Sequence, residues 1–181
     1  NLKLKRNQFI LCSFHREENV ENKKRLEIFL KLLNHLIKKY KIKIFISCHP
    51  RLHKKLKTLN IKNNIKISKP LSFSDYINLQ KNSRLVISDS GTISEETSIL
   101  KFNSVNIRET HERHESMEEG TVPLTSFNFN QMINVVESMM INKDNQINTC
   151  SDYKKTNISV IVCRIILSYL NFTKRYIRKD N

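Results

Sequence analysis

Four polar segments come directly after short apolar runs of the chain: His15–Asn19, His49–Pro50, Asp89–Thr92 and Arg108–Glu115. Short apolar runs that alternate with amphipathic stretches are typical of a parallel sheet with crossover helices. In such a sheet the carboxyl ends of all strands lie at one edge, where open α/β folds bind their ligands. The imidazole, guanidinium and carboxylate groups are therefore expected to meet in one site.

The segment Asp89-Ser90-Gly91-Thr92 joins a predicted strand to a predicted helix. Gly91 would let the backbone turn sharply and approach a ligand closely. The free N–H groups of the helix start, the helix dipole and the two hydroxyls suit a phosphate. The alternative is an ordinary N-cap by Ser90 or Asp89. Two arginines that follow the next strand favour a diphosphate site: Arg108 and Arg113.

Two further groups of polar residues have alternative interpretations. Glu95 and Glu96 lie in the first turn of the predicted helix, where a carboxylate interacts favourably with the dipole or accepts hydrogen bonds from a ribose. His111 and His114 are three residues apart, with the cationic Arg113 between them. Zinc-binding HExxH helices have a separation of four, so we expect no metal at this segment.

The apolar pattern predicts an α/β fold with a parallel sheet flanked by helices. Strands are expected at 9–14, 42–48, 65–67, 85–88 and 104–107, and helices at 26–37, 51–59, 92–100 and 131–140. Another helix, capped by Ser74 or Asp75, would run to 82. The division is expected to be 1–145 for a Rossmann-like domain and 146–181 for a polar loop and a closing helix at 159–172.

The net charge of the chain bears on whether it binds nucleic acid. The 181 residues carry a net charge of +15, which suggests a polyanion as partner. The region Arg51–Lys69 has seven basic and no acidic residues, but Glu95–Glu119 has seven acids against three bases. With no RNA- or DNA-binding motif, the lysine excess indicates a solvated face, and nucleic-acid binding through 51–69 is the less favoured alternative.

Cellular location is also constrained by the sequence. No apolar stretch reaches the roughly 20 residues of a membrane span. The four cysteines form no CxxC motif, and no apolar segment of a secretory signal follows the basic residues 1–8. We therefore expect a reduced, cytoplasmic protein, and a chain that begins partway through a longer one.

The four motifs together resemble a known family. They are Ser13-Phe14-His15-Arg16-Glu17-Glu18-Asn19, Cys48-His49-Pro50, Ser88-Asp89-Ser90-Gly91-Thr92-Ile93-Ser94-Glu95-Glu96 and Arg108-Glu109-Thr110-His111-Glu112-Arg113-His114-Glu115 through Glu119-Gly120-Thr121. In order and spacing, over about 9–141, they are similar to the carboxyl-terminal half of the non-hydrolysing UDP-N-acetylglucosamine 2-epimerases. Thr92 and the stretch 157–169 look more like the branch that makes UDP-N-acetyl-L-fucosamine.

The resemblance implies a fold and a set of site residues. The fold would be the carboxyl-terminal, UDP-binding half of a glycosyltransferase-B-type structure. Catalytic His15 would face the sugar and the diphosphate. The other implied UDP-sugar contacts are Ser90 and Gly91 to the diphosphate, Glu96 to the ribose, Arg113 to the phosphates, Arg108 in support, and Arg16 and His49 near a second, activating UDP-sugar.

The resemblance also implies an isomerase reaction. Family members remove the proton at C2 of the sugar, expel UDP to form a glycal, and add UDP back with the proton on the opposite face. The carboxylates that move this proton come largely from the amino-terminal half, so we expect this chain alone to be inactive. No cofactor is implied, the full-length family forms homodimers, and the products serve cell-surface polysaccharides such as capsule and lipopolysaccharide. The alternatives are a catalytically silent UDP-sugar-binding module or half of a transferase of the same fold.

Overall fold

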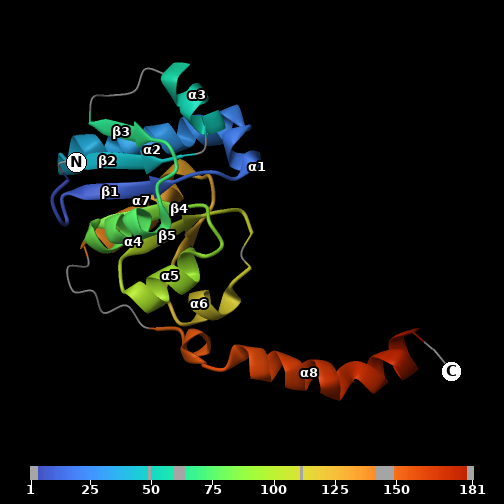
Figure 1. The fold of residues 1–181 in the computed structure, drawn as a ribbon. Helices are drawn as coiled ribbons and strands as arrows, with labels where there is room; N and C mark the ends of the chain where they lie inside the picture. Colours follow the sequence, from blue (N-terminus) through green and yellow to red (C-terminus); the bar gives the residue numbers. More distant parts are fainter. Residues whose placement is uncertain (1–3, 49, 59–63, 111, 142–148, 179–181) are drawn as a thin grey trace. The chain divides into compact units, whose positions relative to one another are not determined.

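The computed structural model describes residues 4–48, 50–58, 64–110, 112–141 and 149–178 (Figure 1). These residues fall into two compact units, Asn1–Cys150 and Ser151–Asn181. The first unit holds the sheet. The second holds a 3-10 turn at Ser151–Lys154, helix α8 (Ile158–Phe172) and a π-helical turn at Thr173–Arg178. Within the second unit Tyr169 and Phe172 pack edge to face, with ring centroids 6.0 Å apart.

The first unit is built on a six-stranded parallel sheet. Its strands are β1 (Phe9–Ser13), β2 (Lys43–Ser47), β3 (Ile65–Ser68), β4 (Leu85–Ser88), β5 (Ser104–Ile107) and β6 (Leu124–Thr125). They lie in the order β3-β2-β1-β4-β5-β6, with Ser13 in register with both Ser47 and Ser88. All neighbouring strands are parallel, but the order in which the chain adds strands changes direction between β1 and β4. This position is the switch point of a doubly wound fold.

Helices cover both faces of this sheet (Figure 1). They are α1 (Glu17–Val20), α2 (Lys23–Tyr40), α3 (Pro50–Thr58), α4 (Phe73–Asn82), α5 (Ile93–Leu100), α6 (His114–Glu118) and α7 (Phe129–Ile141). Apolar residues of α2, α3 and α7 form one core layer, and those of α4 and α5 contribute to the other. The strands are apolar on both sides because both of their faces are covered.

Successive side chains of β1 point to opposite faces of the sheet and so contribute to both core layers. Ile10 and Cys12 belong to the layer of α2 and α7, whereas Phe9 and Leu11 belong to the opposite layer. Phe14, directly after β1, stacks on another buried ring of the first layer, Phe29 of α2, with centroids 4.4 Å apart. The residue that precedes His15 is therefore anchored in the core.

The predicted sheet and long helices are confirmed, with shifts of a few residues at their ends. The short elements α1, α6 and β6 of the first unit were missed, as were the 3-10 and π-helical turns of the second. The predicted cap of α4 was wrong, because Ser72 is the N-cap and its Oγ accepts a hydrogen bond from the Asp75 backbone N–H at 3.2 Å. Among the helices that the structure describes, none has the length and apolar content needed to cross a membrane.

Candidate functional site

The carboxyl ends of β1 and β4 place two polar loops side by side at the switch point of the sheet. The loop after β1 carries His15 and Arg16, and the loop after β4 carries Asp89 to Thr92. A backbone hydrogen bond from Asp89 N to Ser13 O, 3.2 Å long, joins the two loops at their base. This is the position at which doubly wound folds bind ligands.

Asp89 is a fully buried carboxylate that holds the loop after β1. Its oxygens accept hydrogen bonds from the backbone N–H groups of His15 at 3.1 Å and Arg16 at 2.9 Å. They also accept from Asn19 Nδ2 at 3.1 Å and lie 2.9 Å from His15 Nδ1. A buried charge is stable only with such partners, so these contacts fix the geometry of the loop.

The environment of His15 favours its protonated form. The hydrogen bond with Asp89 raises the pKa of the imidazole above its ordinary value, and the charge of Asp89 adds to this effect. Partial burial and the guanidinium of Arg16 act in the opposite direction, but the balance is a raised pKa. In its protonated form this imidazole would suit an anionic ligand.

Three arginines surround the carboxylate of Glu112, and we call Arg16, Arg108 and Arg113 the arginine cluster. Arg108 Nη2 lies 2.5 Å from Glu112 Oε1, Arg16 Nη2 lies 3.5 Å from the same oxygen, and Arg113 Nη1 lies 3.9 Å from Oε2. The hydrogen bond and charge of Arg108, and then the charges of Arg16 and Arg113, hold the pKa of Glu112 below its usual range. The cluster thus surrounds an anion of the chain itself.

Arg108 is the buried member of the arginine cluster. Its side chain is only 3% exposed, whereas that of Glu112 is 52% exposed. Arg108 Nε is buried and has no hydrogen-bond partner among the described residues. A buried guanidinium with an unused donor below an exposed carboxylate is an arrangement that can accept a second anion.

Gly91 lies against the arginine cluster. A Cβ atom built on Gly91 would lie 3.6 Å from both Arg108 Nη1 and Glu112 Oε2, which is ordinary van der Waals distance. The backbone bends at Gly91, as expected, but without a positive φ angle, so the bend does not itself require glycine. The absent side chain instead leaves open the space between the loop backbone and Arg108.

Polar side chains surround the start of α5. The side chain of Thr92, the N-cap residue, makes no capping hydrogen bond, but Ser90 Oγ accepts from the Thr92 backbone N–H at 3.3 Å, as the alternative of a cap by Ser90 expected. The Ser90 hydroxyl also lies 3.0 Å from the Thr92 hydroxyl, which donates to Glu96 Oε1 at 2.7 Å. Glu96 Oε2 accepts from Gln80 Nε2 at 2.5 Å. Ser90 and Glu96 are thereby linked along the helix start.

Arg113 is also tied to α5. Its Nε donates to Glu95 Oε1 at 2.7 Å, and about a third of each side chain is exposed. The other carboxylate oxygen of Glu95 is buried without a partner among the described residues. Glu95 therefore holds Arg113 near the helix start, while Glu96 is held by Thr92 and Gln80.

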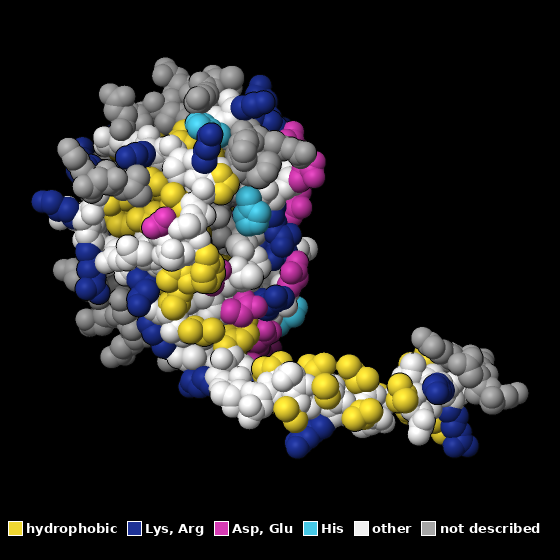
Figure 2. Space-filling model, viewed as in Figure 1, with side chains coloured by type: hydrophobic (Ala, Val, Ile, Leu, Met, Phe, Trp, Pro, Cys, Tyr) yellow, Lys and Arg dark blue, Asp and Glu magenta, His cyan; other side chains and the backbone are white. Residues whose placement is uncertain are grey.

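The structure brings the predicted site residues together at one edge, apart from His49, which lies outside the described residues. The grouped residues are His15, Arg16, Ser90, Gly91, Glu96, Arg108 and Arg113. Figure 2 shows basic and acidic side chains interleaved on the side where α1 and α6 lie in Figure 1. His111 also lies outside the described residues, and within the described ranges no three potential metal ligands gather.

Two residues of the candidate site were missed from the sequence: Asp89 as the anchor of His15, and Glu112 as the anion inside the arginine cluster. Asp89 directly follows a strand of buried residues, and this position could have indicated a buried carboxylate. Glu112 lies four residues after Arg108, but no helix spans these two residues. Their pairing depends on the loop conformation, which periodicity does not predict.

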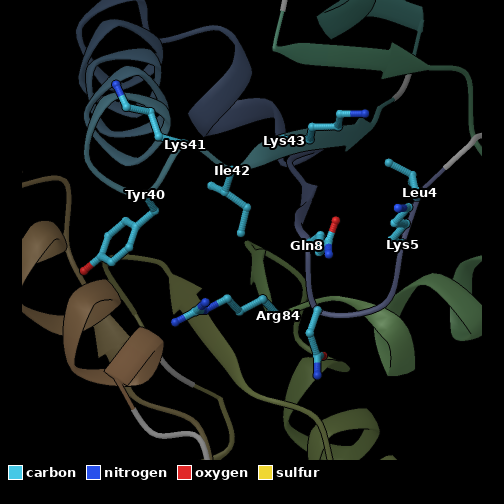
Figure 3. Close-up of a pocket in the computed structure, with 9 residues that line it drawn as sticks. Leu4, Lys5, Gln8, Tyr40, Lys41, Ile42, Lys43 and Arg84 are labelled. Carbon is cyan, nitrogen blue, oxygen red and sulfur yellow. The ribbon is translucent and has the colours of Figure 1, made fainter.

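A cavity of about 420 Å³ lies at the opposite edge of the sheet, beside the starts of β1, β2 and β4. Lys5, Lys41, Lys43 and Arg84 are among its lining residues, and Figure 3 shows them with Tyr40 and Gln8 around the opening. Arg84 Nη2 donates to the backbone oxygen of Met140 at 3.0 Å. This cavity is separated from the arginine cluster by the length of the strands.

The strand order and the loops at the switch point define a Rossmann-like domain, the carboxyl-terminal half of a glycosyltransferase-B-type fold. A family model described as UDP-N-acetylglucosamine 2-epimerase matches residues 1–167. The chain belongs to this family of epimerases.

Individual relatives agree with this assignment. The UDP-N-acetylglucosamine 2-epimerase of Methanocaldococcus jannaschii is 37% identical over 143 residues, which are 76% of this chain and 39% of the relative. A crystal structure of the M. jannaschii enzyme in complex with UDP-GlcNAc and UDP superposes with a TM-score of 0.76 at 32% identity, over 90% of this chain and 46% of that one. The structure of the UDP-N-acetylglucosamine 2-epimerase from Rickettsia bellii superposes with a TM-score of 0.82 at 35% identity, over 99% of this chain and 49% of that one. The chain thus spans less than half the length of these relatives.

Proposed function

We propose that this chain binds the UDP part of a UDP-N-acetyl-amino sugar and is the nucleotide-binding half of a 2-epimerase. The observation that carries the proposal is the arginine cluster closed around Glu112, next to the start of α5 and the open space at Gly91. Guanidinium groups and helix N-termini are the groups that proteins use for phosphates. The M. jannaschii relative, crystallised with UDP-GlcNAc and UDP, supports a ligand of this class.

Each part of the ligand has a matching group. The diphosphate would lie over Gly91, between the N–H groups of α5 and the arginine cluster, in place of the Glu112 carboxylate. Glu96, already a hydrogen-bond acceptor for Thr92 and Gln80, would accept from the ribose hydroxyls. His15 would donate from its ring to the diphosphate on the side of the sugar. His49 would serve a second, activating UDP-sugar together with Arg16.

The proposed chemistry is elimination and re-addition of UDP. Loss of the C2 proton and of UDP would give a glycal, and these cationic groups would stabilise the charge of the departing diphosphate. Carboxylates beyond this chain would move the proton, so this chain alone would bind nucleotide without epimerising it. We further propose a homodimeric enzyme of the cytoplasm that makes precursors of cell-surface polysaccharides, with UDP-N-acetyl-L-fucosamine as one candidate product.

Isothermal titration of the chain with UDP tests the proposal, beside a Glu96→Ala, Arg113→Ala double variant. We expect saturable binding by the native chain and its loss in the double variant, because both the ribose acceptor and one phosphate donor are removed. The matched control is Lys23→Ala, Glu27→Ala on exposed positions of α2. Equal binding by the double variant would place the nucleotide elsewhere, and no binding by a folded native chain would contradict the proposal.

A Gly91→Ala variant separates binding from folding. The added methyl would meet Arg108 and Glu112 only at ordinary contact distance, so the thermal unfolding midpoint should stay close to that of the native chain. The same methyl would stand where the diphosphate approaches the backbone, and we expect UDP affinity to fall roughly tenfold or more. Unchanged affinity in titration calorimetry would show that no ligand passes over Gly91.

A further inference from the structure

We propose that Asp89 is a positioning residue for His15: its carboxylate holds the Nδ1–H side of the imidazole and thereby presents Nε2 to the ligand. The inference deepens the proposed function, because it assigns the orientation of the ring that would meet the diphosphate. It does not follow from the sequence pattern, in which Asp89 is one of several polar residues after β4.

Asp89 makes several contacts with one short segment of the chain, His15–Arg16. Its carboxylate binds the backbone N–H of His15 as well as His15 Nδ1, so the residue is held at two points. It also accepts from the Arg16 backbone N–H, and its own carbonyl accepts from Arg16 Nε at 2.9 Å. A ring that is fixed both through its backbone and through one nitrogen has little freedom to rotate.

The other ring nitrogen of His15, Nε2, lies on the exposed side of the residue pair. Asp89 is fully buried, whereas the side chain of His15 is 48% exposed. Within the part of the chain that the structure describes, no hydrogen bond joins His15 Nε2 to another group. Because Nδ1 is occupied by Asp89, Nε2 is the nitrogen left to bind a ligand. In the neutral ring it is an acceptor, and in the cationic ring it donates.

The charge state of His15 then links ligand binding to pH. The charged groups acting on the ring are Asp89, which raises the pKa, and Arg16, which lowers it. A phosphate oxygen needs the donor form of Nε2, so affinity for a diphosphate should fall as the pH rises through the raised pKa. Removal of the Asp89 charge should shift this fall to lower pH.

The experiment uses imidazole nitrogen NMR of the native chain and of Asp89→Asn, with Asp75→Asn, at an exposed position of α4, as the matched control. In the native chain and the control, we expect the neutral His15 ring to carry its proton on Nδ1 and to titrate above ordinary histidine. In Asp89→Asn the titration should move to lower pH and the preference for Nδ1–H should weaken. A native ring protonated on Nε2, or a titration unmoved in a folded Asp89→Asn chain, would overturn the inference; the native spectrum tests it even if the variant does not fold.

Titration with UDP-GlcNAc, whose diphosphate diester does not itself ionise in this pH range, supplies the second readout. We expect Asp89→Asn to weaken binding roughly tenfold at neutral pH, about the effect of one charge-assisted hydrogen bond, and to shift the pH profile. In His15→Gln the pH dependence should vanish, and adding Asp89→Asn to it should produce no further shift of the profile. NMR results as expected without any UDP-GlcNAc binding would contradict the proposed function alone, whereas binding with an unmoved profile would contradict the role of Asp89.

Discussion

Replacement of Arg108 by Met should nearly abolish UDP binding while the chain remains folded. Arg108 is the buried member of the arginine cluster, and its guanidinium lies against both Gly91 and Glu112. Loss of one partner of a buried charge pair typically costs about 2–5 kcal/mol of binding free energy, which is roughly 30-fold or more in Kd. Met has a similar length, and the partner that remains, Glu112, is 52% exposed and still lies near Arg16 and Arg113, so we expect the chain to stay folded. Titration calorimetry measures the UDP affinity of the variant, and circular dichroism shows whether it is folded.

Arg84→Met is the matched control for this prediction. Arg84 is a partly buried arginine that donates to a backbone oxygen, and it lines the cavity at the opposite edge of the sheet. Its replacement should leave UDP affinity unchanged. If Arg84→Met weakened UDP binding as much as Arg108→Met does, the nucleotide would belong at that cavity and the proposed site would be wrong.

Replacement of Phe29 by Ala should produce the largest loss of stability among the substitutions discussed. The Phe29 ring is fully buried and stacks on Phe14 at 4.4 Å. Truncation of a buried Phe to Ala costs about 3–5 kcal/mol, because apolar contact is lost and a cavity remains. Since domains are stable by only about 5–15 kcal/mol, urea unfolding should show a strongly lowered midpoint.

Phe73→Ala is the matched control for the stability prediction. The Phe73 side chain is 79% exposed at the start of α4, so its truncation should change the free energy of unfolding by no more than about 0.5 kcal/mol. A loss of less than about 1 kcal/mol in Phe29→Ala would contradict the packing described for α2. Because Phe14 directly precedes His15, Phe29→Ala should also weaken UDP binding in the fraction that remains folded.

The sheet was predictable because its strands are short apolar runs that alternate with amphipathic helices. The edge at which His15, Ser90 and Arg108 meet was predictable for the same reason, since parallel strands end together. The short elements were not: α1 has four residues and β6 has two, too few for a periodicity to develop. Their formation depends on tertiary contacts with β5 and α2 that local sequence does not encode.

The ion pairs within the candidate site could not be predicted from the sequence either. The motif containing Arg108, Glu112 and Arg113 shows that opposite charges are near one another along the chain. It does not show that Glu112 points into the arginine cluster while Glu95 takes the Nε of Arg113. The role of Asp89 could not be predicted because its partners lie 70 to 74 residues away in the sequence.

At the proposed site, the Glu112 carboxylate would make ligand binding an exchange of one anion for another. A polynucleotide on a lysine-rich surface releases many mobile counterions, and its affinity therefore falls steeply as salt is added. The arginine cluster is already neutralised in part by a carboxylate that stays attached to the chain when a diphosphate displaces it. Few free ions would enter solution, so UDP affinity should depend on salt much less steeply than three arginines would suggest, in a chain whose net charge is +15.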